Sequence, residues 1–260
     1  MINASQLTAD CVDWIRDWFD KNGNAATPAV LGLSGGKDST IAAALIAQAI
    51  GPQRVIGVAM PAHGQSLNDA DAIARYLKIR FLNIPIGNVS DAFNHMVSLD
   101  DGIPLSWSEQ AEQNIPPRIR MTVLYAVAQT YGGRVVNTCN LSENWVGYAT
   151  KYGDAAGDFS PLGQLTVTEI LAMGDYLGLP KEWVHKTPDD GLPHSMSDEE
   201  KLGFRYAEVD LLIRGIITPQ SPGDITPDKI ERMLRWHNAN LHKQLPMPHF
   251  IPSVQKEKKD

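Results

Sequence analysis

This chain has few cysteines, no long apolar run and no excess of positive charge, and each of these features excludes some classes of protein. Its 260 residues include only two cysteines, Cys11 and Cys139, whose spacing suits neither a metal site nor a disulfide framework. We therefore expect reduced thiols and a cytoplasmic protein. No stretch approaches the roughly 18 apolar residues of a transmembrane helix. The N-terminus also lacks the basic start and apolar core of a secretory signal.

Basic residues are outnumbered by acidic ones, 23 to 30, which gives a formal net charge of −7. The only dense basic run, at 256–259, lies within a segment (250–260) that we expect to be a flexible, solvated tail. An acidic chain without a basic stripe is not expected to bind nucleic acid, and nothing predicts a membrane partner. Hydrophobic residues make up 43% of the chain, as in ordinary globular proteins. We expect a single domain over residues 1–260.

Short apolar segments alternate with amphipathic ones over the first half of the chain. The patterns predict strands at 29–33, 55–60, 80–84 and 134–138, and helices at 6–21, 38–49, 67–77, 89–99 and 117–131. Pro116-Pro117 is expected to open the last of these helices. This alternation predicts an α/β fold with a parallel twisted sheet covered by helices on both faces. The remainder is expected to be helical, at 166–177, 197–214 and 226–243, with a polar loop at 187–194.

The segment Leu31–Thr40 lies between a predicted strand and a predicted helix, and it is the most informative part of the chain. Gly35 and Gly36 let the backbone approach a ligand closely. The free amides at the start of the helix would face an anion, and Ser34, Ser39 and Thr40 would add hydroxyl donors. Asp38 suits such a cradle only if a cation lies between it and the anion, so it predicts magnesium bridging to phosphate oxygens.

This loop differs from the phosphate loop of kinases and GTPases, because Leu31 stands where the first glycine is needed and Asp38 follows Lys37. Ser-Gly-Gly-x-Asp-Ser instead resembles the loop of the PP-loop ATP pyrophosphatases, whose fold is adenine nucleotide α-hydrolase-like. Glu143, after another predicted strand end, could join Asp38 at the metal. An ordinary glutamate at a helix start is the alternative.

The run 147–162 shows neither helix nor strand periodicity, and we expect it to form a lid over a nucleotide. It contains Thr150-Lys151-Tyr152-Gly153-Asp154, then Gly157-Asp158. Arg118-Ile119-Arg120-Met121 precedes it, and Leu241-His242-Lys243 comes near the end. With the Gly32–Ser39 loop, these motifs closely resemble the NAD synthetases over nearly the whole chain. Glutamine-dependent members carry an extra amidase domain, for which 260 residues leave no room, so the resemblance is to the ammonia-dependent type.

The resemblance implies a reaction, a cofactor and an assembly. ATP, as co-substrate, adenylylates the nicotinate carboxylate of deamido-NAD, and ammonia then displaces AMP to give NAD, the last step of NAD biosynthesis. Magnesium is the implied cofactor. A homodimer with deamido-NAD near the subunit boundary is also implied, and Trp107 and Tyr125 are candidate interface residues, although core packing explains them equally well.

The resemblance further implies roles for individual residues. Magnesium would be held by Asp38 and Glu143. ATP would be bound by Gly32, Leu33, Ser34, Gly35, Gly36, Lys37, Asp38, Ser39, Gln65 and Thr138. Deamido-NAD would be bound by Asn114, Arg118, Tyr148, Lys151, Asp154, Asp158, His242 and Lys243. The catalytic residues would be Asp38, Glu143, Lys151 and Asp154. From the chemistry of a carboxylate rather than from the resemblance, Asp154 or Asp158 could steer ammonium and accept a proton from it. Since Arg118 and Arg120 cannot easily face one ligand together, one of them is expected to be structural.

Three positions depart from the resemblance. Many synthetases have Lys where this chain has Val167, Arg where it has Ala59, and Thr or Ser where it has Asp189. Lys37 or Lys186 is the candidate to replace the lysine missing at 167. Two alternatives therefore stay open: another PP-loop amidating or thiolating enzyme, and a catalytically weak nucleotide-binding homologue.

Overall fold

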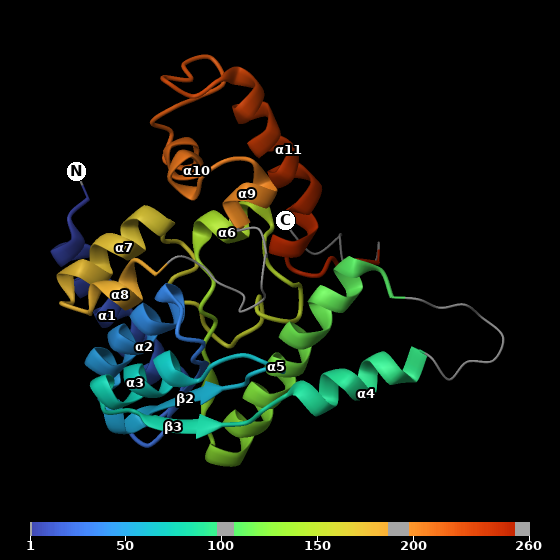
Figure 1. Ribbon diagram of the computed structural model, residues 1–260. Coiled ribbons are helices and arrows are strands. Elements are labelled where there is room, and N and C mark those ends of the chain that lie inside the picture. Colours follow the sequence, from blue (N-terminus) through green and yellow to red (C-terminus); the bar gives the residue numbers. More distant parts are fainter. Residues whose placement is uncertain (1, 98–106, 187–197, 253–260) are drawn as a thin grey trace.

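A computed structural model describes residues 2–97, 107–186 and 198–252 of the chain (Figure 1). The predicted loop at 187–194, which includes Asp189, and the end of the tail lie outside the described residues. Within them, four parallel strands form one sheet in the order β3-β2-β1-β4. The strands are β1 (Ala29–Gly32), β2 (Val55–Ala59), β3 (Arg80–Asn83) and β4 (Arg134–Val135). The α/β class and the parallel sheet are confirmed.

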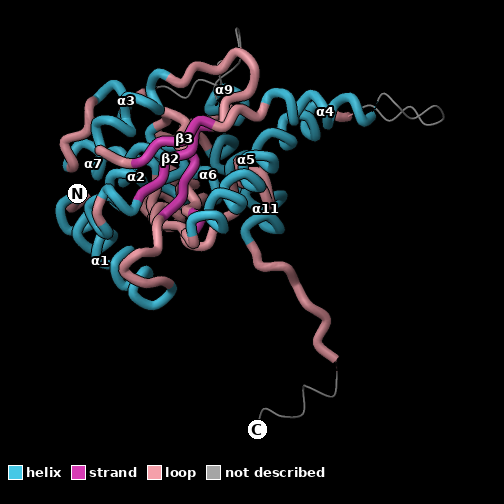
Figure 2. The backbone as a smooth tube through the Cα atoms, turned by 90° about the horizontal axis from the view of Figure 1, so that it is seen from below, coloured by secondary structure: helices cyan, strands magenta, loops and turns pink. Residues whose placement is uncertain are grey.

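Alternate side chains of a strand point to opposite sides of the sheet. Both sides are apolar here, so helices cover each face. Ala29 and Leu31 of β1 belong to a cluster with the helices on one face, whereas Val30 packs with the helix on the other. The first face carries α1 (Ala4–Asn22), α2 (Lys37–Ile50), α3 (Asn68–Leu77), α7 (Val167–Tyr176) and α8 (Lys181–Val184). The second carries α5 (Glu109–Tyr131), against which α4 (Gly87–Val97) packs. Figures 1 and 2 show the two layers.

The start of α5 corrects one prediction, because the helix begins eight residues before the predicted 117 and holds Pro116 and Pro117 in its interior. Ser108 is the residue that caps it, accepting a hydrogen bond from the backbone of Ala111 at 3.2 Å. Both prolines lack an amide donor, so each removes one backbone hydrogen bond from the interior of α5, ahead of the well-buried part at Ile119 and Val127.

The predicted helix 197–214 and the predicted strand 134–138 are both shorter than expected. Gly203, with a φ of 80°, separates α9 (Asp198–Leu202) from α10 (Tyr206–Ile213). A glycine in that conformation ends a helix without steric cost. Beyond Val135 the strand continues only as a bridge between Val136 and Phe159, because the following loop takes over the hydrogen bonds.

The helical C-terminal portion is built around a third cluster, which joins it to the rest of the chain. Here α10 and α11 (Pro227–Gln244) pack against α6 (Leu141–Val146), a short helix the sequence patterns did not predict. Val146, Tyr206 and Met233 are buried together in this cluster. After α11 the chain runs on without regular structure, with Phe250 almost fully exposed (Figure 2). Among the described residues, no helix is both long and apolar enough to cross a membrane.

Candidate functional site

The strand order places a topological switch point between the carboxyl ends of β1 and β4. From β1 the chain passes through α2 to β2 on one side, and it returns only later to place β4 on the other side. Parallel sheets bind ligands where the chain changes direction in this way. The loop Ser34–Ser39 follows β1 and the segment Asn137–Glu143 follows β4, so both predicted constellations lie at this point.

The Ser34–Ser39 loop is folded by its own hydrogen bonds into a tight turn ahead of α2. Ser34 Oγ accepts from the backbone amide of Gly36 at 3.2 Å and lies 3.2 Å from Ser39 Oγ. Gly35 has a φ of 84°, and a Cβ there would approach Asp69 Cβ to 2.8 Å, so only glycine fits. The turn leads directly into α2, whose N-terminus has no capping side chain, and such a helix start can bind an anion through its backbone amides.

Two residues of this loop contribute less than the sequence suggested. Thr40 is fully buried and its hydroxyl donates to the carbonyl of Gly36, so it is not a donor to a ligand. The Leu33 side chain lies in the core and its amide donates to Val58. Leu33 could therefore contact a ligand only through its backbone carbonyl. The neighbouring Gly32 is half-buried.

A single ammonium group links the two predicted metal ligands. Lys37 Nζ lies 2.8 Å from Asp38 Oδ2 and 3.5 Å from Glu143 Oε1. The Lys37 side chain is 11% exposed, and those of Asp38 and Glu143 are each 19% exposed. The structure therefore brings together two carboxylates that are distant in sequence, in a partly dehydrated site with one positive charge between them.

The pKa values of this cluster are shifted by burial and by neighbouring charges, in the way expected of a site that lacks positive charge. Burial, followed by the negative charge of Asp38, raises the pKa of Glu143 to about 7, although Lys37 and Asn140 oppose the shift. Burial lowers the pKa of Lys37, but the charges of Asp38 and Glu143 outweigh it and raise the pKa overall. Two carboxylates facing one ammonium thus leave a net negative charge, which suits a divalent cation with phosphate and water ligands.

Sequence reasoning missed Asn140, which is fully buried and connects the two halves of the site. Its Nδ2 donates to Asp38 Oδ1 at 3.2 Å, and its Oδ1 accepts from the backbone of Glu143 at 2.9 Å. Asn140 is therefore the cap of α6 and a clamp on Asp38. The signal was present as Asn140-x-x-Glu143, the spacing of a helix N-terminus.

Tyr206, at the start of α10, is a second residue that the sequence did not point to. Its hydroxyl is buried without a hydrogen-bond partner among the described residues. Burial and then the negative charge of Glu143 raise its pKa. The C-terminal helices thus place a polar group close to the carboxylate cluster.

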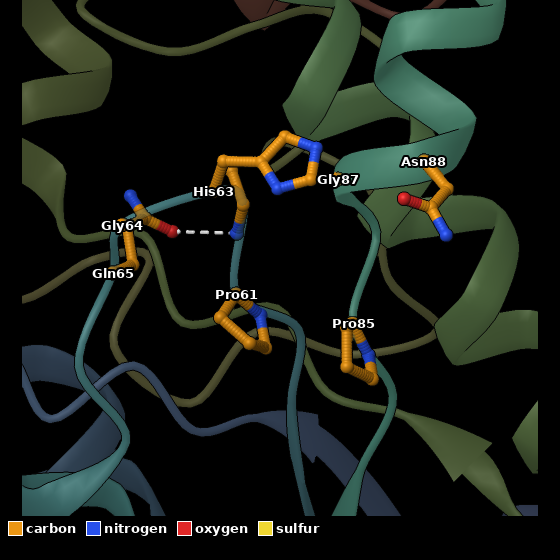
Figure 3. Close-up of a pocket in the computed structure, with 8 residues that line it drawn as sticks. Pro61, His63, Gly64, Gln65, Pro85, Gly87 and Asn88 are labelled. Atoms are coloured by element: carbon orange, nitrogen blue, oxygen red, sulfur yellow. Dashed lines mark hydrogen bonds between the residues drawn. The ribbon is translucent and has the colours of Figure 1, made fainter.

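Gln65 and Arg120 connect the loop after β2 with α5. Arg120 donates to Gln65 Oε1 at 3.1 Å and to the carbonyl of Met60 at 3.1 Å. Arg120 is thus the structural member of the arginine pair, while Arg118 is exposed. A depression of about 230 Å³ lies beside Gln65, between the ends of β2 and β3, and Figure 3 shows its lining from Pro61 to Gln65, with Pro85, Gly87 and Asn88.

Within the predicted run 147–162, residues 147–158 form neither helix nor strand, and hydrogen bonds tie them to α5 and α11. Thr150 Oγ1 donates to Asn114 on α5 at 2.5 Å, and the Thr150 amide donates to Asp154 at 2.7 Å. Lys151 Nζ donates to the carbonyl of His242, and Lys243 Nζ to that of Gly147. The two lysines therefore cross-link this segment to α11, and the structure brings most of the predicted dinucleotide-binding residues into one neighbourhood.

The other predicted site residues differ in their hydrogen bonding and in their exposure to solvent. Asp158 lies beside β4, where its carboxylate accepts from the amide of Val135 at 2.7 Å, so the structure does not bring it to the carboxylate cluster. The ring of His242 is exposed, whereas Tyr148 and Thr138 are half-buried close to α6. Asp154 is itself exposed, but surrounding protein reduces the solvation of its carboxylate and raises its pKa.

Val167 and Ala59, which stand where many NAD synthetases have Lys and Arg, are both buried among apolar side chains. Val167 is buried in the third cluster with Tyr206 and Phe204, and Ala59 is buried in the core beneath α2. Lys186 is paired with Asp69 on α3, at 2.5 Å, whereas Lys37 reaches the carboxylates. Of the two lysines considered as replacements, the structure places Lys37 at the cluster.

The parallel sheet, with a Ser-Gly-Gly-Lys-Asp-Ser turn at its switch point, defines an α/β nucleotide-binding protein of the PP-loop type. The chain belongs to the NAD synthase family, which it matches over residues 7–246. It is 34% identical to the NH(3)-dependent NAD(+) synthetase of Archaeoglobus fulgidus over 94% of this chain and 95% of that one.

Solved structures agree with this assignment. The structure of NMN synthetase from Francisella tularensis has a TM-score of 0.82 and 29% identity, covering 97% of this chain and all (100%) of that one. The NH3-dependent NAD synthetase from Campylobacter jejuni, in complex with the nitrate ion, has a TM-score of 0.78 and 25% identity, again covering 97% and 100%.

Proposed function

We propose that this chain catalyses the ATP-dependent amidation of deamido-NAD by ammonia, giving NAD, AMP and pyrophosphate. Family membership supports this, and one observation carries it at the level of residues: an anion-binding turn and two carboxylates meet at the switch point of the sheet. The nicotinate carboxylate would attack the α-phosphorus of ATP with loss of pyrophosphate. Ammonia would then attack the acyl-adenylate, releasing AMP.

The proposed roles follow the geometry. Amides of the Ser34–Ser39 turn and Lys37 would hold the triphosphate, and Gln65 and Thr138 would flank the nucleotide. The other substrate would lie between α5, the 147–158 segment and α11, which side-chain hydrogen bonds of Asn114, Lys151 and Lys243 hold together. Arg118, Tyr148 and His242 would contact it from the same three parts of the chain. Asp154, close to Lys243, would accept the proton that ammonium loses, and its raised pKa suits that task. Asp158 remains a weaker candidate because Val135 occupies its carboxylate.

We propose Asp38 and Glu143 as the magnesium ligands from the chain. Among the described residues no group of three or more His, Cys, Asp or Glu side chains is arranged to hold a metal. Mg²⁺ is nevertheless commonly coordinated by only one or two protein carboxylates, with phosphate oxygens and water as its other ligands. When bound, the ion would neutralise charge on the phosphates of ATP.

A chromatographic assay with deamido-NAD, ATP, magnesium and ammonium tests the proposal. NAD and AMP formed in equal amounts, with pyrophosphate, are the expected products. A folded protein that binds ATP but forms no NAD would contradict it and favour a catalytically weak homologue. AMP and pyrophosphate formed only with another acceptor would favour a different PP-loop amidating or thiolating enzyme.

Formation of NMN is the second candidate, because the F. tularensis NMN synthetase superposes well on this chain over its full length. The acceptor would then be nicotinate mononucleotide, which lacks the adenylate half of deamido-NAD. The two acceptors are distinguished by comparing kcat/KM in one assay. We expect deamido-NAD to be preferred, since the similar curated relatives are NAD synthetases.

We also propose a homodimer formed through α4 and α5. In Figure 1, α4 extends away from the body of the molecule and touches α5. Its apolar residues Val89, Phe93 and Met96 are exposed. Tyr125, in contrast, is partly buried and packs against the apolar cluster between the sheet and α5. Light scattering should give the mass of a dimer, and Phe93→Glu should give a monomer.

The compartment we propose is the cytoplasm, which supplies ATP and keeps thiols reduced. Cys11 and Cys139 are both free, and burial raises the pKa of each, so neither is poised to oxidise. We further propose that residues 1–260 act as one functional unit, because the candidate site draws side chains from Ser34 to Lys243.

A further inference from the structure

Lys37 occupies a position that its place in the sequence does not explain. It is the first residue of α2, yet its side chain is only 11% exposed and contacts the carboxylates of both Asp38 and Glu143. Its partners come from opposite sides of the switch point: Asp38 follows β1, and Glu143 lies 106 positions away on α6. The ammonium therefore stands where the two carboxylates converge.

The same place cannot serve two cations at once. A divalent ion ligated by Asp38 and Glu143 would lie within a few ångströms of Lys37 Nζ, and like charges at that range repel strongly in a partly buried site. Removing the ammonium without a substitute is equally unfavourable, because the carboxylates would then face each other. One positive group must therefore replace the other.

An alternative place for the ammonium lies close by. Lys37 is the N-terminal residue of α2, and it directly follows Gly35 and Gly36 of the turn that is proposed to hold phosphate. Its four-carbon side chain can turn toward a phosphate oxygen by changing rotamers alone, with no movement of the backbone. A triphosphate would thus offer Lys37 a new partner when a metal takes the old one.

We propose that Lys37 is a resident counter-cation of the Asp38–Glu143 pair, displaced onto a phosphate group of ATP when the nucleotide brings its divalent ion. This inference rests on the metal position proposed above. It makes the binding of metal and the binding of nucleotide interdependent: the metal alone must displace the ammonium without offering it a new partner, whereas metal and ATP together give each charge a partner.

Manganese binding measured by electron paramagnetic resonance tests the exchange without catalysis. The wild-type protein should bind Mn²⁺ weakly alone and at least about tenfold more tightly with α,β-methylene-ATP, a range typical of linked sites. Lys37→Met should bind Mn²⁺ alone about tenfold more tightly than wild type, and the analogue should add little. Lys229→Met is the matched control, because Lys229 forms a comparable pair with Glu208 at 2.8 Å on the C-terminal helices. It should behave as wild type.

The outcomes show whether the Lys37 exchange or the proposed metal site is wrong. If Lys37→Met binds Mn²⁺ alone no better than wild type, while Glu143→Gln abolishes binding with the analogue, the exchange is wrong and the metal site stands. If the wild type binds no Mn²⁺ even with the analogue, both are wrong. Tight wild-type binding without nucleotide would also overturn the exchange.

A second variant guards against misfolding of Lys37→Met, in which the two carboxylates lose their partner. The double variant Lys37→Met/Glu143→Gln removes charge of both signs, so it should melt close to wild type. In thermal melts, Mn²⁺ alone should stabilise Lys37→Met strongly, wild type slightly and the double variant not at all. A Mn²⁺ shift in the double variant equal to that of Lys37→Met would contradict the proposal.

Discussion

Two glutamates of this protein begin from the same local motif and end in opposite states. Glu143 and Glu169 each stand three residues after a helix-capping side chain, Asn140 for α6 and Thr166 for α7. Glu169 completes a capping box, accepting from the amide of Thr166 at 2.8 Å, and it also pairs with Arg214 at 2.5 Å. Glu143 faces Lys37 and shares it with Asp38.

The difference shows in the proton affinity of the two carboxylates. Burial raises the pKa of Glu169, but hydrogen bonds from Arg214 and Thr166 and the charge of Arg214 outweigh it and lower the pKa. The pKa of Glu143 is raised to about 7 by burial and by Asp38. The carboxylate of Glu169 has hydrogen bonds and a positive charge that stabilise its ionised form. Glu143 has too little positive charge nearby for this, as is common for residues of ligand-binding sites.

The largest expected effect is on turnover. Glu143→Gln keeps the shape of the side chain but removes a charge proposed to hold the metal, so kcat should fall about a hundredfold or more. Glu169→Gln is the matched control and should keep near-normal turnover. Steady-state assays on both variants measure this; a Glu143→Gln enzyme of normal activity would remove Glu143 from the site.

The second prediction concerns pH. Because its folded pKa of about 7 exceeds the ordinary 4.5, Glu143 makes the free energy of unfolding decrease as pH rises from about 4.5 to 7. The full penalty above pH 7 is at most about 3 kcal/mol. In urea titrations with EDTA, Glu143→Gln should therefore be more stable than wild type at pH 8 and equal at pH 4.5. Parallel stability curves for the two proteins would refute the raised pKa.

The caps of the two helices offer a third comparison. Asn140→Ala removes the cap of α6 and also the donor to Asp38, which together should cost about 2 kcal/mol of stability. Thr166→Ala removes only a cap and should cost about 1 kcal/mol. Chemical denaturation gives both values. Turnover should fall in Asn140→Ala alone; equal losses of activity would argue against its role as a clamp on Asp38.

The smallest effect is expected at Glu169. Glu169→Gln should cost about 1 kcal/mol at pH 7, since solvent screens part of the Arg214 pair. Because the folded pKa is below the ordinary value, this stabilisation is present above about pH 4.5 and is lost as pH falls. The wild-type advantage over Glu169→Gln should thus shrink in acid, opposite in sign to Glu143. A difference that grows in acid would show the pair to be misassigned.

The helices around these sites show how far sequence patterns reach. Apolar periodicity predicted α2, α3, α7 and α11 within a residue or two, because one buried face is enough to specify each element. It misplaced the start of α5, where the cap at Ser108 outweighs the proline signal, and it missed α6, which is too short to show a period.

The sequence by itself determined the order of strands and helices and the chemistry of the Ser34–Ser39 turn. Both follow from local rules: periodic burial, glycine conformations and the free amides at a helix start. Only the tertiary structure decided that Lys37 bridges Asp38 to Glu143, that Asn140 clamps the pair, and that Val167 is buried beside Tyr206. These contacts depend on β4 lying next to β1, and strand order is set by packing of the whole chain, which no local pattern encodes.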